Sequence, residues 1–303
     1  MADNKHTIVF QGERGANSHI ACIERFPEME PVPSATFEDA FAAVSAGEAG
    51  YAMIPIENSL AGRVADIHHL LPTSGLFIVA EHFLRIRHQL MTLPGTSLDD
   101  LTHVMSHGHA LGQCRATIRA LGLTQIVAAD TAGSARIIAE RGERHVAAIA
   151  SDLAAEIYGL EILKSEIEDE EHNTTRFIVL AAAPDDAEPG SGDVITSFVF
   201  RVRNVPAALY KALGGFATNG VNMTKLESYI VGGSFAAAQF YADIEGHPSD
   251  PGVRLALEEL NFFSNELKIL GAYHASPLRA GIEARSAGQR LVEGPAGQPR
   301  VSA

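Results

Sequence analysis

Short apolar segments with the character of buried strands alternate with helix-forming segments, and this alternation constrains the fold more than any other feature. Three such strand segments follow one another in the middle of the chain, at residues 103–107, 125–129 and 146–150, and a helical segment follows each. Consecutive strand–helix units pack into a parallel sheet with helices on its faces. We therefore predict an α/β protein that contains a doubly wound layer.

The segment 172–180, with the sequence HNTTRFIVL, joins a polar cluster to an apolar, β-prone run. A strand with Thr175 and Arg176 at its polar end can present a hydroxyl and a fixed guanidinium at the floor of a cleft, which suits an anionic substrate with a leaving oxygen. The alternative is a structural ion pair for Arg176 behind an Asx-type turn. Because this segment returns the chain to its first units, it predicts two lobes joined by two crossings, with a small-molecule site between them.

Polar residues also stand at the ends of other predicted strands. Residues 11–18 follow the strand 7–10, and Glu57–Ser59 follow the strand 50–56. Ligands of open α/β sheets collect at the carboxyl ends of the strands, and the N-termini of the following helices bind anions. The first turn is not a dinucleotide fingerprint, because Phe10 stands where the first glycine of G-x-G-x-x-G would be. These strand ends are therefore the predicted walls of an anion site.

The overall charge excludes two classes of partner. The net charge is −14, so binding to nucleic acid or to an anionic membrane is not expected, and an anionic substrate needs a local positive pocket. No apolar run approaches the length of a membrane span.

Two cysteines, Cys22 and Cys114, are too few for a disulfide framework. We expect a soluble protein of the reducing cytoplasm.

Histidine and cysteine do not form a recognisable metal motif. The pairs His68–His69 and His107 with His109 lack carboxylate or Cys partners at a ligand spacing. Cys114 lies inside a predicted helix, where a lone Cys is more often a small core residue than a nucleophile. We therefore predict neither a metal site nor a cofactor.

A second folding unit follows a linker at residues 183–194, which is rich in Pro, Gly and acidic residues. The predicted order βαββαβ over residues 195–275 is the ferredoxin-like plan. Such a sheet has a bare edge and an open face, which favours pairing with a second copy as a homodimer or homotetramer. The Gly, Pro and Arg content of residues 276–303 predicts a disordered tail.

Several blocks together resemble one enzyme family. Tyr158–Leu163, then Asp169, then Thr175–Leu180 resemble the signature of prephenate dehydratase, including the spacing of Asp169 to the Thr-Arg-Phe triplet. Similar blocks begin at Gln11, Pro55 and Asp130, and another block runs from Ser106 to Gln113-Cys114. The C-terminal βαββαβ unit resembles an ACT regulatory domain. The resemblance covers roughly residues 6–275.

The resemblance implies a fold and an activity. The fold is a two-lobed catalytic domain of the type II periplasmic-binding-protein kind, followed by the ACT domain. Its expected ranges are 6–182 for the catalytic domain, with lobe 1 at about 6–76 plus 175–182 and lobe 2 at about 77–174. The implied enzyme is a carbon–oxygen lyase (hydro-lyase) that converts prephenate to phenylpyruvate, with L-phenylalanine as effector. Arogenate dehydratase is the alternative, and a non-catalytic amino-acid sensor is a third interpretation.

The resemblance also implies residue roles, and the family's essential threonine falls on Thr175. We expect its hydroxyl to help the departing hydroxide, while Arg176 holds a substrate carboxylate. Glu57 is a candidate proton relay, and its alternative is a paired structural carboxylate. The other predicted substrate contacts lie at helix starts and on the returning segment: Ser18, Asn58, Ser59, Thr131, Ala132, Asn173, Thr174 and Phe177.

In the ACT domain the resemblance implies L-phenylalanine binding at a dimer interface. Ala207 stands where the family has a glycine, whose missing side chain lets a ligand approach the backbone closely. Tyr229-Ile230 stands where the family has Arg-Pro. The predicted effector contacts lie at the first helix and on the following strand: Val205, Pro206, Ala207, Ala208, Leu209, Asn222, Glu227 and Ser228.

Overall fold

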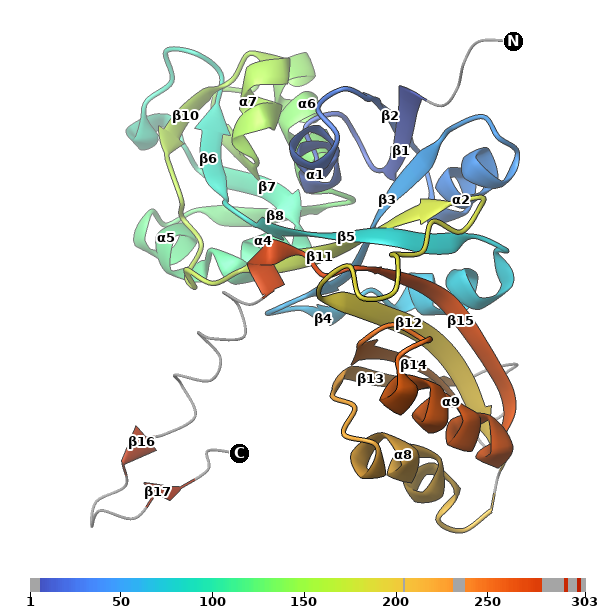
Figure 1. The fold of residues 1–303 in the computed structure, drawn as a ribbon. Helices are drawn as coiled ribbons and strands as arrows, with labels where there is room; N and C mark the ends of the chain where they lie inside the picture. The colour runs from blue at the N-terminus through green and yellow to red at the C-terminus, as the bar shows by residue number, and fades with distance from the viewer. Residues whose placement is uncertain (1–5, 204, 231–237, 280–291, 294–298, 301–303) are drawn as a thin grey trace.

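The computed structural model describes residues 6–203, 205–230, 238–279, 292–293 and 299–300. Two α/β lobes lie side by side, and a C-terminal α+β domain lies below the first of them (Figure 1). This is the predicted fold class, two lobes followed by a βαββαβ unit, and it is confirmed. Within the described ranges, no helix is long and apolar enough to cross a membrane.

The first lobe is built on a sheet with the strand order β2-β1-β3-β11-β5. β1 is parallel to β2 and β3, whereas β11 is antiparallel to both of its neighbours because the chain returns here from the second lobe. The strands are β1 (Thr7–Gln11), β2 (Glu30–Ser34), β3 (Tyr51–Asn58), β4 (Gly62–Arg63), β5 (Phe77–Arg85) and β11 (Thr174–Ala181). The helices are α1 (Asn17–Arg25), α2 (Phe37–Ser45), α3 (Ala65–Leu70) and the 3-10 turn η2 (Leu71–Thr73).

Side chains of β11 alternate between the two faces of this sheet, as the geometry of a strand requires. Phe177 and Val179 belong to a core that includes residues of α1. Ile178 and Leu180 belong to a second core, which continues into the C-terminal domain as far as Tyr273. The returning strand is therefore packed between two hydrophobic layers, and its start is where polar residues meet the cleft.

The second lobe has the strand order β10-β6-β9-β7-β8. The three expected strand–helix units begin with β7, β8 and β9, which are parallel, so the doubly wound layer is confirmed. The predicted helix that contains Cys114 is interrupted at this residue, which separates α4 from α5. The strands are β6 (Gln89–Thr92), β7 (His103–His107), β8 (Thr124–Ala128), β9 (Val146–Ala150) and β10 (Glu161–Lys164). The helices are η3 (Leu98–Asp100), α4 (Gly108–Gln113), α5 (Arg115–Ala120), α6 (Thr131–Arg141) and α7 (Asp152–Tyr158).

The boundary between the lobes differs from the prediction. β5 pairs with β11 from Phe77 to Arg85, so this segment belongs to the first lobe rather than the second. The chain crosses between the lobes just after β5 and again just before β11. The two crossings run side by side, because Ile86 N donates a hydrogen bond of 2.8 Å to Asn173 O.

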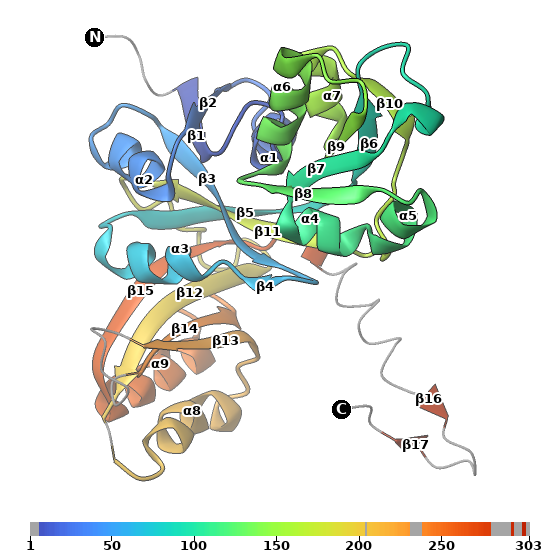
Figure 2. The same ribbon diagram turned by 180° about the vertical axis from the view of Figure 1, so that it is seen from behind.

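The C-terminal domain has an antiparallel sheet with the order β13-β14-β12-β15. Figure 2 shows its two helices on the side of the sheet that faces away from the first lobe. Residues 231–237, which include part of the predicted third strand, lie outside the described residues. The elements are β12 (Val194–Val202), α8 (Ala208–Thr218), β13 (Met223–Ile230), β14 (Ala238–Glu245), α9 (Pro251–Phe263) and β15 (Ser264–His274).

The other face of this sheet is covered at one end by the first lobe, so the expectation of an open face is wrong there. Tyr241 and Tyr273 share a hydrophobic core with Ile78 of β5. β15 approaches β5 so closely that a Cβ at Gly271 would lie 1.9 Å from the carbonyl oxygen of Ile78. Only glycine permits this contact, and the two domains form one packed unit here.

Residues 276–279 also hold to the first lobe. Ser276 N and the Arg279 guanidinium both donate to the carboxylate of Glu81. The prediction of a disordered tail is therefore wrong for its first residues. Farther along, β16 (Val292–Glu293) pairs with β17 (Pro299–Arg300). The remaining residues of the predicted tail lie outside the described residues.

Candidate functional site

Thr175 and Arg176, adjacent at the start of β11, point to opposite faces of the first-lobe sheet. Thr175 lies opposite Asn58 and Leu84 in the two flanking ladders, and Asn58 Nδ2 is 2.9 Å from its hydroxyl oxygen. Arg176 instead makes its contacts on the face that packs against the C-terminal domain. The predicted pairing of hydroxyl and guanidinium in one cleft is wrong, because successive side chains of a strand alternate.

The Arg176 guanidinium is 3 % exposed and joins three parts of the molecule. It donates to Glu81 at 2.9 Å, to Glu57 at 3.1 Å and to the hydroxyl of Tyr273 at 3.0 Å, and it also pairs with Asp243. Burial lowers the pKa of Arg176, but Asp243 and the other acidic neighbours raise it more, so it lies well above its ordinary value. Arg176 is thus the structural ion pair, and its donors are used within the protein rather than on a substrate carboxylate.

Glu57 likewise faces the C-terminal domain. One carboxylate oxygen accepts from Arg176, and the other accepts from Lys225 of β13. Burial raises the pKa of Glu57, but Lys225 and Arg176 lower it more, so the result is below the usual glutamate range. A carboxylate held in its charged form is a poor proton donor. The structure therefore corrects the proton-relay hypothesis, and Glu57 is the paired structural carboxylate.

The side chain of Asn58 fixes the polarity of the contact with Thr175. Asn58 Oδ1 accepts from the backbone N–H groups of Leu60 at 3.0 Å and Ala61 at 2.8 Å. Backbone N–H groups only donate, so the amide nitrogen of Asn58 must face Thr175 Oγ1, at 2.9 Å, and Asn173 Oδ1, at 2.8 Å. Thr175 is the acceptor here. Its own O–H proton has no acceptor among the described residues and can be donated to a substrate.

The network continues into the second lobe through a buried amide. Asn173, fully buried on the second crossing, donates from Nδ2 to Gln113 Oε1 at 2.9 Å. Gln113 ends α4, so this bond links the two lobes. Gln113 was not among the predicted site residues. The only sequence signal was its place in a family block that begins at Ser106, since nothing in the local pattern indicates that its amide meets the returning strand.

A cavity of about 490 Å³ lies beside this network and is walled by both lobes. Asp169, whose spacing from the Thr-Arg-Phe triplet marks the family signature, accepts from the backbone N–H groups of Arg115 and Ala116 and thereby caps α5. Its role is to shape the wall. The lining residues are Leu60, Ala61, Gly108, His109, Gly112, Gln113, Arg115, Asp169 and Glu170. A cavity of this size suits a small molecule.

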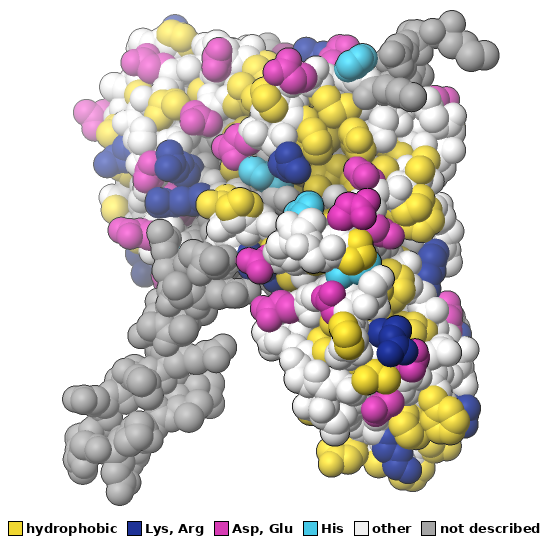
Figure 3. All heavy atoms as spheres, in the orientation of Figure 1, with side chains coloured by type: hydrophobic (Ala, Val, Ile, Leu, Met, Phe, Trp, Pro, Cys, Tyr) yellow, Lys and Arg dark blue, Asp and Glu magenta, His cyan; other side chains and the backbone are white. Residues whose placement is uncertain are grey.

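A smaller cavity, of about 290 Å³, lies beside the start of α1. Leu84, the ladder partner of Thr175, is on its wall together with Arg85 and Arg87. α1 has no side-chain cap, so its first backbone N–H groups add positive potential. Acidic side chains are scattered over the face shown in Figure 3, as the net charge of −14 requires. Glu24 and Asp152 also line this cavity, and Arg85 and Arg87 pair with Glu166 at 3.6 and 3.5 Å, so its wall carries both signs of charge.

Ser59 and Thr174 hold the end of β3 to the second crossing. Ser59 Oγ donates to His172 O and accepts from Thr174 N, both at 3.0 Å. A helix start near Ser59, with the helix beginning at about Gly62, is the expectation, but Gly62–Arg63 form β4 and α3 begins only at Ala65. Both residues support the site through bonds within the protein.

Four other predicted contacts are not joined to this network by any hydrogen bond between described residues. Phe177 and Ala132 are buried in the cores of the first and second lobe, so their side chains do not face a substrate. A substrate anion cannot bind Gly133 N at the start of α6, near Thr131, because this N–H already donates to the carboxylate of the N-cap residue Asp130. Ser18 is buried in the first turn of α1.

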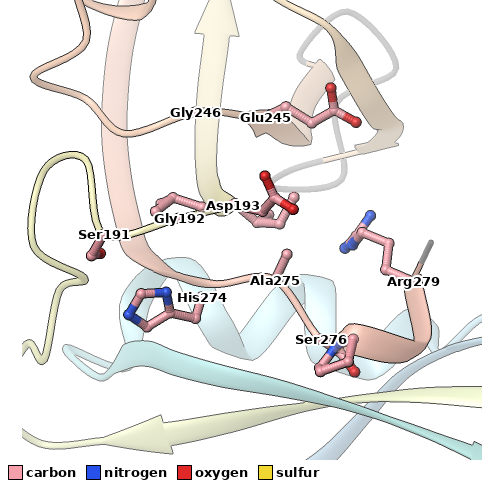
Figure 4. Close-up of a pocket in the computed structure, with 12 residues that line it drawn as sticks. Ser191, Gly192, Asp193, Glu245, Gly246, His274, Ala275, Ser276 and Arg279 are labelled. Carbon is pink, nitrogen blue, oxygen red and sulfur yellow. The ribbon is translucent and has the colours of Figure 1, made fainter.

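The cavity drawn in Figure 4 lies where the linker meets the C-terminal sheet and the residues after β15. Its volume is about 600 Å³, and Asp193, Glu245 and Arg279 are on its wall. Arg279 is already bound to Glu81 by two bonds, of 3.0 and 2.6 Å. None of the residues that line this cavity belongs to the Thr175 network, so it is separate from the candidate active site.

Comparison with known proteins decides the family. A family model described as "Prephenate dehydratase" matches residues 8–185. The chain belongs to the prephenate dehydratase family. A relative from Komagataeibacter europaeus, named "Bifunctional N-acyl-homoserine lactone acylase/prephenate dehydratase", is 50% identical over 91% of this chain and 99% of its own length.

Two further members of the prephenate dehydratase family bear on substrate and effector. "Arogenate dehydratase/prephenate dehydratase 2, chloroplastic" of Arabidopsis thaliana is 39% identical over 88% of this chain and 72% of its own length. A structure titled as prephenate dehydratase in complex with L-Phe from Arthrobacter aurescens superposes with a TM-score of 0.82 at 29% identity, over 93% of this chain and 98% of that one.

The residues predicted to bind an effector in this family member lie at the start of α8 and on β13. Ala207, the N-cap of α8, has φ +60°, a left-handed conformation that favours glycine. Glu227 of β13 pairs with Lys225 and Arg63, and Arg63 also donates to the carbonyl of Ser228. The strand that carries the predicted effector contacts is therefore tied to the end of β3, next to Asn58.

Proposed function

We propose that this protein catalyses the decarboxylating dehydration of prephenate to phenylpyruvate. Membership of the prephenate dehydratase family supports the reaction class. The observation that carries the assignment of the site is the Asn58–Thr175 hydrogen bond, whose fixed direction leaves the Thr175 proton free to be donated.

The reaction needs little covalent chemistry from the protein. The bond from the ring to its carboxylate breaks, its electron pair enters the ring, and the hydroxyl leaves from the opposite carbon as the ring becomes aromatic. The departing hydroxide takes a proton to form water. The protein has to orient the substrate and stabilise the charge that develops on the leaving oxygen.

We assign these tasks to residues on both lobes. Thr175 donates to the leaving oxygen, and Asn58 holds the Thr175 hydroxyl in that direction. The amide nitrogen of Gln113, which lines the larger cavity, donates to a substrate carboxylate. Arg85 and Arg87, which pair with Glu166, lie on the wall of the smaller cavity and would have to exchange this partner for a substrate carboxylate. Since Glu57 is held ionised and a threonine hydroxyl is a weak acid, the proton comes from bulk solvent and is relayed to the leaving oxygen by water in the cleft.

Arogenate is the second candidate substrate. It carries an ammonium group where prephenate has a keto group, and two acidic residues, Asp169 and Glu170, line the larger cavity. The name of the 50% identical relative adds N-acyl-homoserine lactones as a third substrate to examine. A thiol nucleophile is not available for such an acylase step, because Cys22 and Cys114 are buried and burial raises the pKa of both thiols.

The test is turnover by the purified full chain on prephenate, on arogenate and on an N-acyl-homoserine lactone. We expect phenylpyruvate from prephenate at a kcat/KM above that for the other two. Preferential release of phenylalanine from arogenate would reassign the enzyme to arogenate dehydratase, and a lack of turnover on both prephenate and arogenate would overturn the proposal.

We further propose that residues 195–275, after the linker 183–194, are an ACT regulatory domain that binds L-phenylalanine across a homodimer or homotetramer interface. The L-Phe complex of the Arthrobacter aurescens relative supports this. The contacts would come from Val205–Leu209, Asn222 and Glu227-Ser228. Two buried free cysteines suit a reducing compartment, so we propose a cytoplasmic location. Calorimetric titration with L-phenylalanine tests effector binding, and the mass of the assembly tests the oligomeric state.

A further inference from the structure

His88 lies one residue before β6, at the point where the first crossing enters the second lobe. It is 3 % exposed, and its Nε2 is 2.9 Å from Gln113 Oε1. Its backbone N–H donates to the carboxylate of Glu168, at 2.9 Å, on the second crossing. The imidazole is therefore held against both crossings and behind the amide that reaches the larger cavity.

The direction of every hydrogen bond in this chain of side chains can be derived. The backbone N–H groups after Asn58 fix its amide, so Asn58 Nδ2 donates to Asn173 Oδ1. Asn173 must then donate from Nδ2, so the atom of Gln113 that receives this bond is its oxygen. The same oxygen lies against His88 Nε2, which must therefore carry a proton.

This assignment leaves the other end of the Gln113 amide free. Its oxygen accepts from both Asn173 and His88, and its nitrogen has no hydrogen-bond partner among the described residues. Because Gln113 lines the cavity of about 490 Å³, the nitrogen can offer N–H donors to an anionic substrate there. Without His88, one of the two groups that hold the amide in this orientation is lost.

We infer that His88 is a positioning residue for the dehydration reaction, which keeps the Gln113 amide nitrogen directed at the substrate. The inference rests on the proposed function. Burial lowers the pKa of the His88 imidazole. The neutral ring with its proton on Nε2 is thus the form that holds Gln113 at neutral pH.

The kinetic experiment compares three variants on prephenate. His88→Phe keeps a ring but removes the donor, and since one hydrogen bond is lost we expect KM to rise about tenfold with kcat within about twofold. His88→Gln, whose amide nitrogen reaches the position of Nε2, should restore KM to within about threefold of the wild type. His82→Phe is the matched control, because His82 is a partly buried histidine of β5 that is bonded to Glu24, and it should leave KM unchanged.

Two further measurements separate a positioning role from a structural one. In the Gln113→Met background, adding His88→Phe should change KM no further, since His88 acts only through Gln113. An unchanged KM in folded His88→Phe, or additive losses in the double variant, would overturn the inference. Nitrogen-15 NMR of labelled histidine reports the tautomer without any substrate. A proton on Nε2 supports the inference, and a proton on Nδ1 overturns it, whether or not the wild type turns over prephenate.

Discussion

Asp243 of β14 and Arg176 of β11 form a buried ion pair that joins the C-terminal domain to the strand carrying Thr175. The two residues are 67 positions apart in the chain. One strand thus presents its threonine to the cleft and its arginine to the other domain. The contact with the C-terminal domain and the Thr175 hydroxyl are therefore only one residue apart in the chain.

Arg176→Met should destabilise the protein far more than it weakens substrate binding. It leaves Asp243 buried without a cation, while Glu81 keeps Arg279 as its partner, and breaking a buried pair in this way costs about 3–5 kcal/mol. Arg176→Lys should recover part of this, because it restores charge without the forked geometry. Denaturant unfolding measures both, and Arg141→Met, at an exposed arginine of α6, is the control. Full stability with a raised KM for prephenate would return Arg176 to the substrate.

Acid should loosen the same interface. Burial raises the pKa of Asp243, but Arg176 and hydrogen bonds from Ser197 and Tyr241 lower it more, so the folded value is below the usual range. Glu57 is lowered in the same way. A carboxylate whose pKa is depressed in the folded protein stabilises it at pH values above its unfolded pKa, about 4. This stabilisation is lost as the pH falls through the folded pKa.

The unfolding free energy should therefore fall more steeply between pH 5 and pH 3 in the wild type than in Asp243→Asn. Denaturant titrations across this range measure the difference. Parallel pH dependence in the two proteins would contradict the pairing of Asp243 with Arg176.

Gly271→Ala should separate β15 from β5. The added Cβ would meet the carbonyl oxygen of Ile78 at 1.9 Å, and backbone atoms cannot move aside cheaply, so we expect a loss of about 1–3 kcal/mol. Gly214→Ala in α8 is the control, because nothing lies within 4 Å of its added Cβ, and alanine there should raise stability by about 1 kcal/mol. Equal effects of the two substitutions on the melting temperature would refute the close approach.

Ala207→Gly should strengthen effector binding. Glycine removes the methyl group, so that a ligand can approach the backbone more closely, and relief of the left-handed strain, about 1–2 kcal/mol, adds to stability. We expect the dissociation constant for L-phenylalanine to fall several-fold in calorimetric titration. Ala217→Gly, inside α8, should lower stability without this gain. A weaker effector affinity in Ala207→Gly would show that the methyl group contributes to the site.

The sequence predicted the fold better than the site. Alternating strand and helix segments and the linker suffice for the lobes and the βαββαβ unit, because local periodicity reports them directly. The segment 77–85 lies in the first lobe and not, as predicted, in the second, because its apolar pattern is the same whether it pairs with β11 or crosses over.

The errors at the site have a common origin in contacts between distant segments. The predicted roles of Arg176 as a carboxylate ligand and of Glu57 as a proton relay are wrong because their partners Asp243 and Lys225 lie beyond the linker. Strand alternation alone indicates that Thr175 and Arg176 face opposite sides of the sheet, although they are adjacent in the chain. His88 and Gln113, 25 residues apart, carry no local pattern that brings them together.

The most direct measurement is the kcat for phenylpyruvate formation by Thr175→Val. Valine keeps the shape of the side chain but removes the hydroxyl, and loss of one aligned donor should lower kcat by about 10²–10³-fold in a protein that still folds. Thr175→Ser, which keeps the donor, should stay within about tenfold of the wild type. Turnover by folded Thr175→Val at near the wild-type rate would contradict the role of the Thr175 hydroxyl.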